Sequence, residues 1–300
     1  MQKTELNIAL LSWQTLECVP SASGIVKSKE SYYVIGDDSP YLFHIDKNFK
    51  LISKAQIYSI EKLQGNTIPK IDKPDFEAME MVSETEILIF GSGSKSPERD
   101  VCILVEIGMQ TFYTKYDISL FYKHLRNLEI MKGFELDIEA LAFDGNLVYL
   151  FNRGRNLIFS FSYKKFIDFC KTGTNFPVPK STLYALPKIN GLEAGFSGAT
   201  IFEDKSYLIF TAAVENAPNA YDDGEILGSF IGVIPLENGT ISDHFLIQQI
   251  PNPGFPLKVE GITIDRIISN TQTDFILVTD NDGKSSEILT LRMTVNKIDN

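Results

Sequence analysis

The sequence has few cysteines, few histidines and no long apolar run. Its 300 residues include three cysteines, Cys18, Cys102 and Cys170, none of them in a CxxC motif. An odd number of widely spaced cysteines supports neither a disulfide framework nor a zinc site, so we expect reduced thiols. The three histidines lie in separate segments, without metal-site or triad spacing. No segment approaches the roughly 18 apolar residues that a membrane-spanning helix needs, so no membrane partner is expected.

Basic side chains are also in deficit. The chain has 28 Lys and Arg against 39 Asp and Glu, a formal net charge of −11. Nucleic-acid-binding proteins neutralise phosphates with clustered Lys and Arg, and no such cluster occurs here, so we exclude nucleic acid as the main partner. The first residues, MQKTELNIALLSWQTLE, lack the continuous apolar core of a signal peptide. The chain as given is therefore expected to be cytoplasmic, unless its beginning has been trimmed.

Short β-rich runs make up most of the sequence. Phe, Trp and Tyr account for 11% of residues and gather in runs such as SYYVI, EILIF, LVYLF and DFILVTD, which turn residues separate. Five segments share one pattern, in which a Ser or Glu and a small residue precede a strand, a polar turn, a second strand and a polar loop. We call the Ser or Glu that begins each segment its anchor. The anchors are Ser23, Glu77, Glu139, Ser197 and Glu260, at spacings of 54, 62, 58 and 63 residues. Such spacings suit four-stranded propeller blades.

The repeat predicts an all-β fold in which residues 1–300 form one five-bladed β-propeller of four-stranded antiparallel blades. Blades would start near residues 23, 77, 139, 197 and 260. The segment after Glu260 joined to residues 1–22 completes a fifth period, so we expect the N-terminal strand to close the last blade and remove an exposed edge. Two segments, 118–131 and 162–172, have apolar residues nearer helical spacing and are expected to form short helices outside the ring.

The anchors indicate an oxygen-rich site at one mouth of the ring. Because they begin the innermost strands, they should converge near the axis. Three carboxylates and two hydroxyls form the kind of cluster that a hard cation such as calcium prefers, with magnesium as the alternative. Without a cation, the carboxylates would have to protonate, pair with basic side chains or stay hydrated. For each acid taken alone, a role as wet channel lining remains the alternative.

The ordered motifs resemble those of a known family. They are Ser-Gly-Ile at 23–25, Glu-Ala-Met at 77–79, Glu-Ala-Leu at 139–141, Gly-Phe-Ser-Gly at 195–198 and Lys-Val-Glu-Gly-Ile at 258–262. This set resembles the calcium-activated nucleotidases, the soluble apyrases, which implies a five-bladed propeller with axial calcium held by the five anchors. The resemblance also implies that Arg153 and Arg155 bind nucleotide phosphates. The chain is similar as well to uncharacterised bacterial propellers described as phytase-like.

Loops expected around the same mouth supply further candidates. Phosphoryl transfer needs a cation at the phosphate oxygens, basic side chains for the developing charge and an acid that orients water. The candidate catalytic residues are Asp37, Asp38, Arg153 and Arg155, and the candidate substrate-binding residues are Lys95, Arg99, Glu215, Asn216 and Asp222. Residues 37–40 also read as a polar turn. The long loop at 212–224 is a candidate lid.

Three hypotheses about function remain, from different classes. The leading hypothesis is a calcium-dependent phosphohydrolase, of the nucleotidase or phytase-like kind, that acts on a phosphorylated small molecule. The second is a lactone or ester hydrolase that uses the same metal as a Lewis acid. The third is a non-catalytic binding or scaffold propeller in which the ion holds the blades together. Fold alone does not choose among them.

Overall fold

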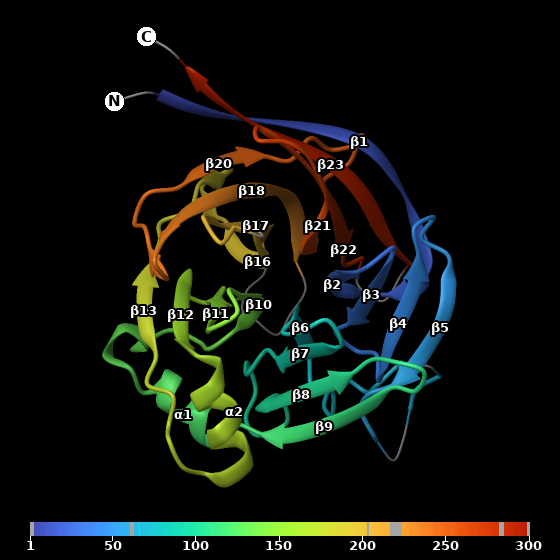
Figure 1. Cartoon of the computed structure of the whole chain (residues 1–300), viewed down its shortest axis with the longest axis vertical. Helices are drawn as coiled ribbons and strands as arrows, with labels where there is room; N and C mark the ends of the chain where they lie inside the picture. Colours follow the sequence, from blue (N-terminus) through green and yellow to red (C-terminus); the bar gives the residue numbers. More distant parts are fainter. Residues whose placement is uncertain are drawn as a thin grey trace.

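Five antiparallel sheets surround a central axis in the computed structural model, which describes residues 3–60, 63–65, 67–202, 204–216, 224–281 and 285–298 (Figure 1). The prediction of an all-β, five-bladed propeller is confirmed. From the axis outward, blade 1 comprises β2 (Ala22–Ser28), β3 (Ser31–Gly36), β4 (Tyr41–Asp46) and β5 (Leu51–Gln56). Blade 2 comprises β6 (Phe76–Met81), β7 (Glu86–Gly91), β8 (Val101–Glu106) and β9 (Phe112–Asp117).

The next two blades are separated by a small hairpin. Blade 3 comprises β10 (Ile138–Phe143), β11 (Leu147–Asn152), β12 (Leu157–Ser162) and β13 (Lys180–Leu183). The hairpin comprises β14 (Lys188–Ile189) and β15 (Leu192–Glu193). Blade 4 comprises β16 (Gly195–Ile201), β17 (Tyr207–Asn216), β18 (Glu225–Glu237) and β20 (Leu246–Gln249), with β19 (Thr240–Ile241) paired to the end of β18.

The last blade joins the two ends of the chain. It comprises β21 (Val259–Ser269), β22 (Gln272–Thr279), β23 (Ser285–Ile298) and, outermost, β1 (Lys3–Pro20). β1 pairs antiparallel with β23 from Lys3 opposite Ile298 to Pro20 opposite Ser285. The predicted closure by the N-terminal strand is therefore confirmed, and backbone hydrogen bonds rather than a loop hold the ring shut.

Each innermost strand is interrupted by a β-bulge at the same place. The register with the second strand of the blade shifts by one residue, so that one residue has no partner opposite it. The bulged residues are Ser23, Glu77, Glu139, Ser197 and Glu260. We call these five residues, which are the sequence anchors, the anchor ring. A bulge bends the strand and redirects the side chain of the extra residue, so the repetition points to a shared role.

The hydrophobic core is divided among the interfaces between neighbouring blades. One buried apolar cluster lies at each of the five interfaces, and each draws side chains from both of the sheets that it joins. In the cluster between blades 5 and 1, for example, Leu16 of β1 and Ile276 of β22 belong with Val34 and Phe43 of blade 1. The stability of each blade therefore depends on its neighbours, as expected for a repeat architecture.

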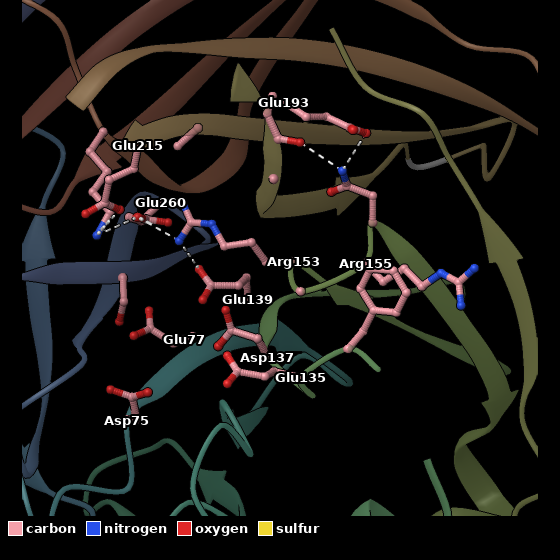
Figure 2. Close-up of a pocket in the computed structure, with 18 of the residues that line it drawn as sticks. Asp75, Glu77, Glu135, Asp137, Glu139, Arg153, Arg155, Glu193, Glu215 and Glu260 are labelled. Atoms are coloured by element: carbon pink, nitrogen blue, oxygen red, sulfur yellow. Dashed lines mark hydrogen bonds and ion pairs between the residues drawn. The ribbon is translucent and has the colours of Figure 1, made fainter. Parts of the chain in front are cut away.

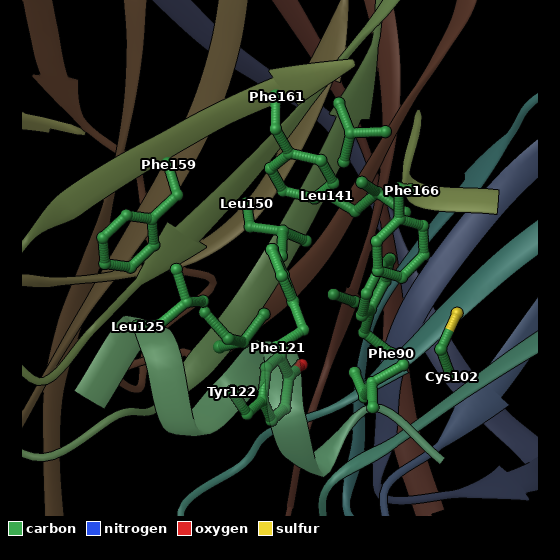
Figure 3. Close-up of a cluster of buried hydrophobic side chains, with 14 of the residues drawn as sticks. Phe90, Cys102, Phe121, Tyr122, Leu125, Leu141, Leu150, Phe159, Phe161 and Phe166 are labelled. Carbon is green, nitrogen blue, oxygen red and sulfur yellow. The ribbon is translucent and has the colours of Figure 1, made fainter. Parts of the chain in front are cut away.

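The two predicted helical segments are helical in the structure. They contain α1 (Ser119–Arg126) with the 3-10 turn Glu129–Met131, and α2 (Tyr163–Thr172). Both helices turn their apolar sides onto the cluster between blades 2 and 3, where Phe121 of α1 meets Phe166 of α2 at 5.4 Å between ring centroids (Figure 3). Their role is packing, as predicted. None of the described helices has the length and apolarity to cross a bilayer.

Candidate functional site

A ligand-sized cavity lies above the anchor ring. Its volume is about 740 Å³, within the range of small-molecule sites. Four of the anchors, Ser23, Glu77, Glu139 and Glu260, line this cavity and also line a void of about 10 Å³ deeper in the channel. They therefore separate the wide mouth from the narrow channel. The sequence predicted that all five anchors open at one mouth; Ser197 is not among the described lining residues of either cavity, and its role as a ligand stays a prediction.

The two serines of the anchor ring tie neighbouring blades together. The hydroxyl of Ser23 donates a hydrogen bond to the carbonyl of Phe76 at 2.5 Å, and the hydroxyl of Ser197 donates to the carbonyl of Val259 at 2.6 Å. Each accepting carbonyl belongs to the residue just before a glutamate of the ring. Because a donating hydroxyl keeps its oxygen lone pairs, this bond leaves both oxygens able to coordinate a cation.

Three further charged side chains line the cavity near the anchor ring. Asp75, Asp137 and Lys258 lie two residues before Glu77, Glu139 and Glu260, directly ahead of β6, β10 and β21, and all three line the cavity. None of these three residues was among the predicted site residues. The pattern of a charged residue, an apolar residue and an anchor, repeated in three blades, was the signal that could have found them.

On one side of the site, Lys73 forms ion pairs with acids of blades 1 and 2. Its ammonium group forms ion pairs with Asp37 and with Asp75, the latter at 2.7 Å. The guanidinium of Arg99, which is 2% exposed, also pairs with Asp75. Asp37, Asp75 and Glu77 are the group of described acids whose oxygens lie within 4.8 Å of one another and could hold a metal ion. Lys73 follows no strand pattern, so sequence periodicity offered no means of finding it.

On the other side of the site, Arg153 and Lys258 form ion pairs with the buried glutamates of the anchor ring. Nη1 of Arg153 lies 3.0 Å from Oε2 of Glu139 and 3.8 Å from Oε1 of Glu260, between the two carboxylates (Figure 2). Nζ of Lys258 lies 3.3 Å from the same Glu260 oxygen, 3.4 Å from Glu215 and 3.3 Å from Asp280. Pairing with bases, one of the outcomes expected for converging carboxylates, is thus what the structure shows.

Burial raises the pKa values of several of these carboxyl groups. It raises the pKa of Asp37 to about 7 and that of Glu260 to about 7, against the opposing effect of the basic neighbours. The pKa of Glu139 rises to about 8 and that of Asp137 to about 6 for the same reason. Burial, together with repulsion from Glu139 and Asp75, raises the pKa of Glu77 well above its usual value. Groups that titrate near neutral pH can accept or give a proton during a reaction.

The residues present fit a hard divalent cation. Oε2 of Glu260 and Oδ1 of Asp37 are buried oxygens without a hydrogen-bond partner among the described residues. Ten acidic and six basic described side chains line the cavity, an excess of carboxylates that a cation would reduce. Carboxylate and hydroxyl oxygens are the donors that calcium and magnesium take. The structure therefore contains a candidate acidic cluster, Asp37, Asp75 and Glu77, of which only Glu77 belongs to the anchor ring. The anchor ring as the metal site, and calcium as its ion, stay predictions.

The two arginines of the predicted pair are not brought together. Arg153 reaches into the axial site, whereas the side chain of Arg155 points away from it (Figure 2). Arg155 donates from Nη1 to the carbonyl of Ile130, and its guanidinium carbon lies 4.4 Å from the ring centroid of Phe134. Both residues line the cavity, but at different ends of it.

Only some of the other predicted site residues line the cavity. Asp37, Arg99 and Glu215 line the cavity, and the described lining includes none of Asp38, Lys95 and Asn216. Asp38 is partly buried beside Asp37, the ammonium of Lys95 donates to the carbonyl of Ile71 at 3.2 Å, and Asn216 is exposed at the end of β17. Asp222 lies outside the described residues. The catalytic and substrate-binding roles assigned to all these residues stay predictions.

Two solved structures similar to this chain are β-propeller proteins of other names, and only the first has a TM-score above 0.5. The structure of glutaminyl cyclase from Myxococcus xanthus matches over 97% of both chains, with a TM-score of 0.52 and 8% sequence identity. Periplasmic gluconolactonase from Pseudomonas aeruginosa matches over 88% of this chain and 70% of its own, with a TM-score of 0.39 and 10% identity. At such identities the first match shows a shared fold and nothing of the activity.

The comparisons by sequence give the family. No curated protein matches the chain. The model of DUF6929, described as a family of unknown function, matches residues 18–293. This match runs from the last residues of β1 to Met293 in β23 and so includes blades 1 to 4, most of the inner three strands of blade 5 and the whole anchor ring. The chain therefore belongs to the DUF6929 family.

Proposed function

We propose that this protein is a metal-dependent hydrolase that cleaves a small carbonyl ester or lactone, with a divalent cation held by the anchor ring. The observation that carries the proposal is the ring itself, in which a bulge recurs in all five blades and places three carboxylates on the floor of a cavity of about 740 Å³. Bulges at the same position in every blade serve to aim side chains, a device often found beside active sites.

The chain supplies the groups that such a reaction needs. A divalent cation, when bound, supplies Lewis acidity to a substrate oxygen. Asp137, with a pKa of about 6, would accept a proton from the attacking water, and Asp37 is a second candidate. Arg153 and Lys258 supply positive charge near an oxygen that becomes negative. Water adds to the carbonyl carbon, the acyl carbon–oxygen bond breaks, and the proton passes to the leaving oxygen.

The charge of the cavity favours a neutral substrate. Acidic side chains outnumber basic ones, and the Arg153 guanidinium already pairs with two carboxylates. Arg155, which a phosphate clamp would require beside it, points elsewhere. A phosphate dianion would meet repulsion from the remaining carboxylates, whereas an ester or lactone carries no charge. We therefore favour the carbonyl substrate over the phosphorylated one.

A calcium-dependent phosphohydrolase is the second candidate. It is favoured by the four basic side chains at the axial site, Lys73, Arg99, Arg153 and Lys258, which a phosphate could recruit once a cation neutralises the carboxylates. In this alternative the partner is a phosphorylated small molecule such as a nucleotide.

The first test asks whether the ring binds an ion. Chelator-stripped protein is melted with and without added calcium chloride, and separately with magnesium chloride. At 100 times its dissociation constant, an ion stabilises the fold by about 2.7 kcal/mol, which we expect to raise the midpoint by roughly 5 °C. Glu139→Gln should lose this rise, and Glu106→Gln, at an exposed position of β8, should keep it. Equal melting of every sample with and without ions would remove the metal from the proposal.

The second test separates the candidates by substrate. Calcium-loaded protein is assayed with γ-butyrolactone, by acid release in a pH-stat, and with p-nitrophenyl phosphate. Lactone turnover that Glu139→Gln abolishes supports the carbonyl hydrolase, and turnover of the phosphate ester alone supports the second candidate. If added ions raise the melting midpoint but neither compound is hydrolysed, the result favours the non-catalytic scaffold, in which the cation joins the blades.

A further inference from the structure

The mouth cavity continues away from the axis into a partly apolar side pocket. Phe134, Arg155, Leu183 and Tyr184 line this part of the cavity, and we call these four residues the side pocket. Phe134 is 49% exposed and Leu183 is 48% exposed, although both are large apolar side chains that line a concave cavity. Exposed apolar side chains are ordinary on a convex surface, but in a cavity they form a surface that an apolar ligand group can cover.

Hydrogen bonds hold Tyr184 and Arg155, two of the four side-pocket residues, in place. The hydroxyl of Tyr184 donates to the carbonyl of Ser242 at 2.6 Å. Its backbone N–H donates to the carbonyl of Asn156 at 3.0 Å. The carbonyl of Ile130 accepts from Arg155 and so holds the guanidinium over the ring of Phe134. Preformed walls lower the entropy cost of binding.

Gly154 explains how two of these walls come together. A Cβ at this position would lie 2.4 Å from the carbonyl oxygen of Glu135, so only glycine allows the turn after β11 to approach residues 133–135 so closely. The glycine that separates Arg153 from Arg155 thus brings Arg155 beside Phe134. Arg153 remains at the axial site, and the NRGRN segment contributes to both parts of the cavity.

From this arrangement we infer that the side pocket binds an apolar, preferably aromatic, substituent of the substrate whose polar group reaches the anchor ring. One face of Phe134 is covered by the guanidinium of Arg155, and the exposed remainder of the ring, with the exposed side chain of Leu183, offers an apolar surface to a second ring. Tyr184 lines the pocket while its ring packs against Phe196. The inference rests on the proposed function for the substrate class, an ester or lactone with an aromatic or alkyl substituent. The pocket itself does not depend on turnover.

The test uses a pair of neutral carbonyl compounds that resist hydrolysis. Butyramide and 4-phenylbutyramide differ by one phenyl group, and their dissociation constants are measured by ligand-observed NMR with calcium-loaded protein. We expect 4-phenylbutyramide to bind at least about tenfold more tightly, the effect of covering one aromatic ring. Phe134→Ala and, separately, Leu183→Ala should remove most of this difference. Phe112→Ala is the matched control, because Phe112 is 60% exposed on β9 and is not a described lining residue.

The outcomes keep the two proposals apart. Preference for the phenyl compound that depends on Phe134 supports the side pocket, whether or not the protein hydrolyses a lactone. Equal binding of both compounds, absence of binding by both, or a preference unchanged in Phe134→Ala would overturn the side pocket even if lactone turnover were found. Because both apolar side chains are half exposed, these substitutions should fold, and the thermal midpoint of each variant checks that they do.

Discussion

At the scale of single residues, the site is a balance between buried acids and the bases that pair with them. Glu139 and Glu260 are 6% and 3% exposed, and a buried carboxylate needs a partner to remain charged. Arg153 partly offsets the rise in pKa that burial causes at both, and Lys258 adds a second contact to Glu260. The same guanidinium therefore stabilises the ion-free site and competes with a cation for the two carboxylates.

Replacing Arg153 tests this double role. Arg153→Met keeps much of the side-chain volume and leaves two buried carboxylates without their shared partner, which should cost about 3 kcal/mol of unfolding free energy in chelator. The same change removes a competing positive charge, so calcium should bind about tenfold more tightly and the calcium-induced rise in melting midpoint should exceed that of the unmodified protein. Calorimetric titration with calcium measures the affinity directly.

Arg155→Met is the matched control for this prediction. Arg155 belongs to the same turn but contacts Ile130 and Phe134 rather than the anchor ring. Its replacement should leave calcium affinity unchanged. A calcium response of the same size in Arg153→Met and in the unmodified protein would show that the arginine and the ion do not share the carboxylates.

At the scale of elements, the small residue after each anchor allows the innermost strands to approach one another. A Cβ on Gly261 would lie 3.0 Å from Cα of Gly24, the corresponding residue of blade 1, and 2.8 Å from Val278. A Cβ on Gly198 would lie 2.9 Å from the carbonyl oxygen of Glu260. The alternation of an anchor with a small residue, first noted as a repeat in the sequence, is therefore a requirement of packing around a narrow axis.

A single methyl group added at Gly261 should destabilise the protein. Gly261→Ala is expected to lower the unfolding free energy by about 1–3 kcal/mol, since the strand backbone must shift to relieve the contact. Urea denaturation gives the value. Gly108→Ala should show no loss, because the nearest atom to its Cβ is 3.7 Å away. Equal stability of the two variants would mean that the inner strands have room to move apart.

At the scale of the whole molecule, the ring is held by β1, which begins the chain and completes the last blade. Leu16 of β1 is 1% exposed and packs in the cluster shared by blades 5 and 1. Near its other end, Leu6 packs in the cluster between blades 4 and 5. One strand thus contributes to two interfaces, and closing the ring joins residues that are nearly 300 positions apart in sequence.

Weakening this closure should destabilise the entire propeller. Leu16→Ala is expected to lower the unfolding free energy by about 2–5 kcal/mol, the usual cost of truncating a buried leucine. Leu11→Ala, on the same strand but 45% exposed, should cost no more than about 0.5 kcal/mol. Trp13, the single tryptophan, reports on β1 by fluorescence while circular dichroism reports on all blades. Separate transitions by the two methods would show that β1 detaches while the ring stays folded.

The sequence alone was sufficient for the fold and for the floor of the site. Strand periodicity, the repeat length and the incomplete fifth period are local or arithmetical properties of the chain, so they predicted the five blades and the closure by β1. The same repeat singled out Ser23, Glu77, Glu139 and Glu260, which line the cavity. The helices were predicted from their own apolar spacing.

Only the tertiary structure decided how the charges at the mouth pair and where the loop side chains point. Lys73 meets Asp37 and Asp75 across two blades, and Arg153 turns inward while Arg155, two residues later, turns outward. Such contacts depend on distances between segments far apart in the chain and on the close approach that Gly154 permits, neither of which leaves a periodic trace in the sequence. The repeats thus specify the propeller, whereas the chemistry of its mouth depends on contacts between them.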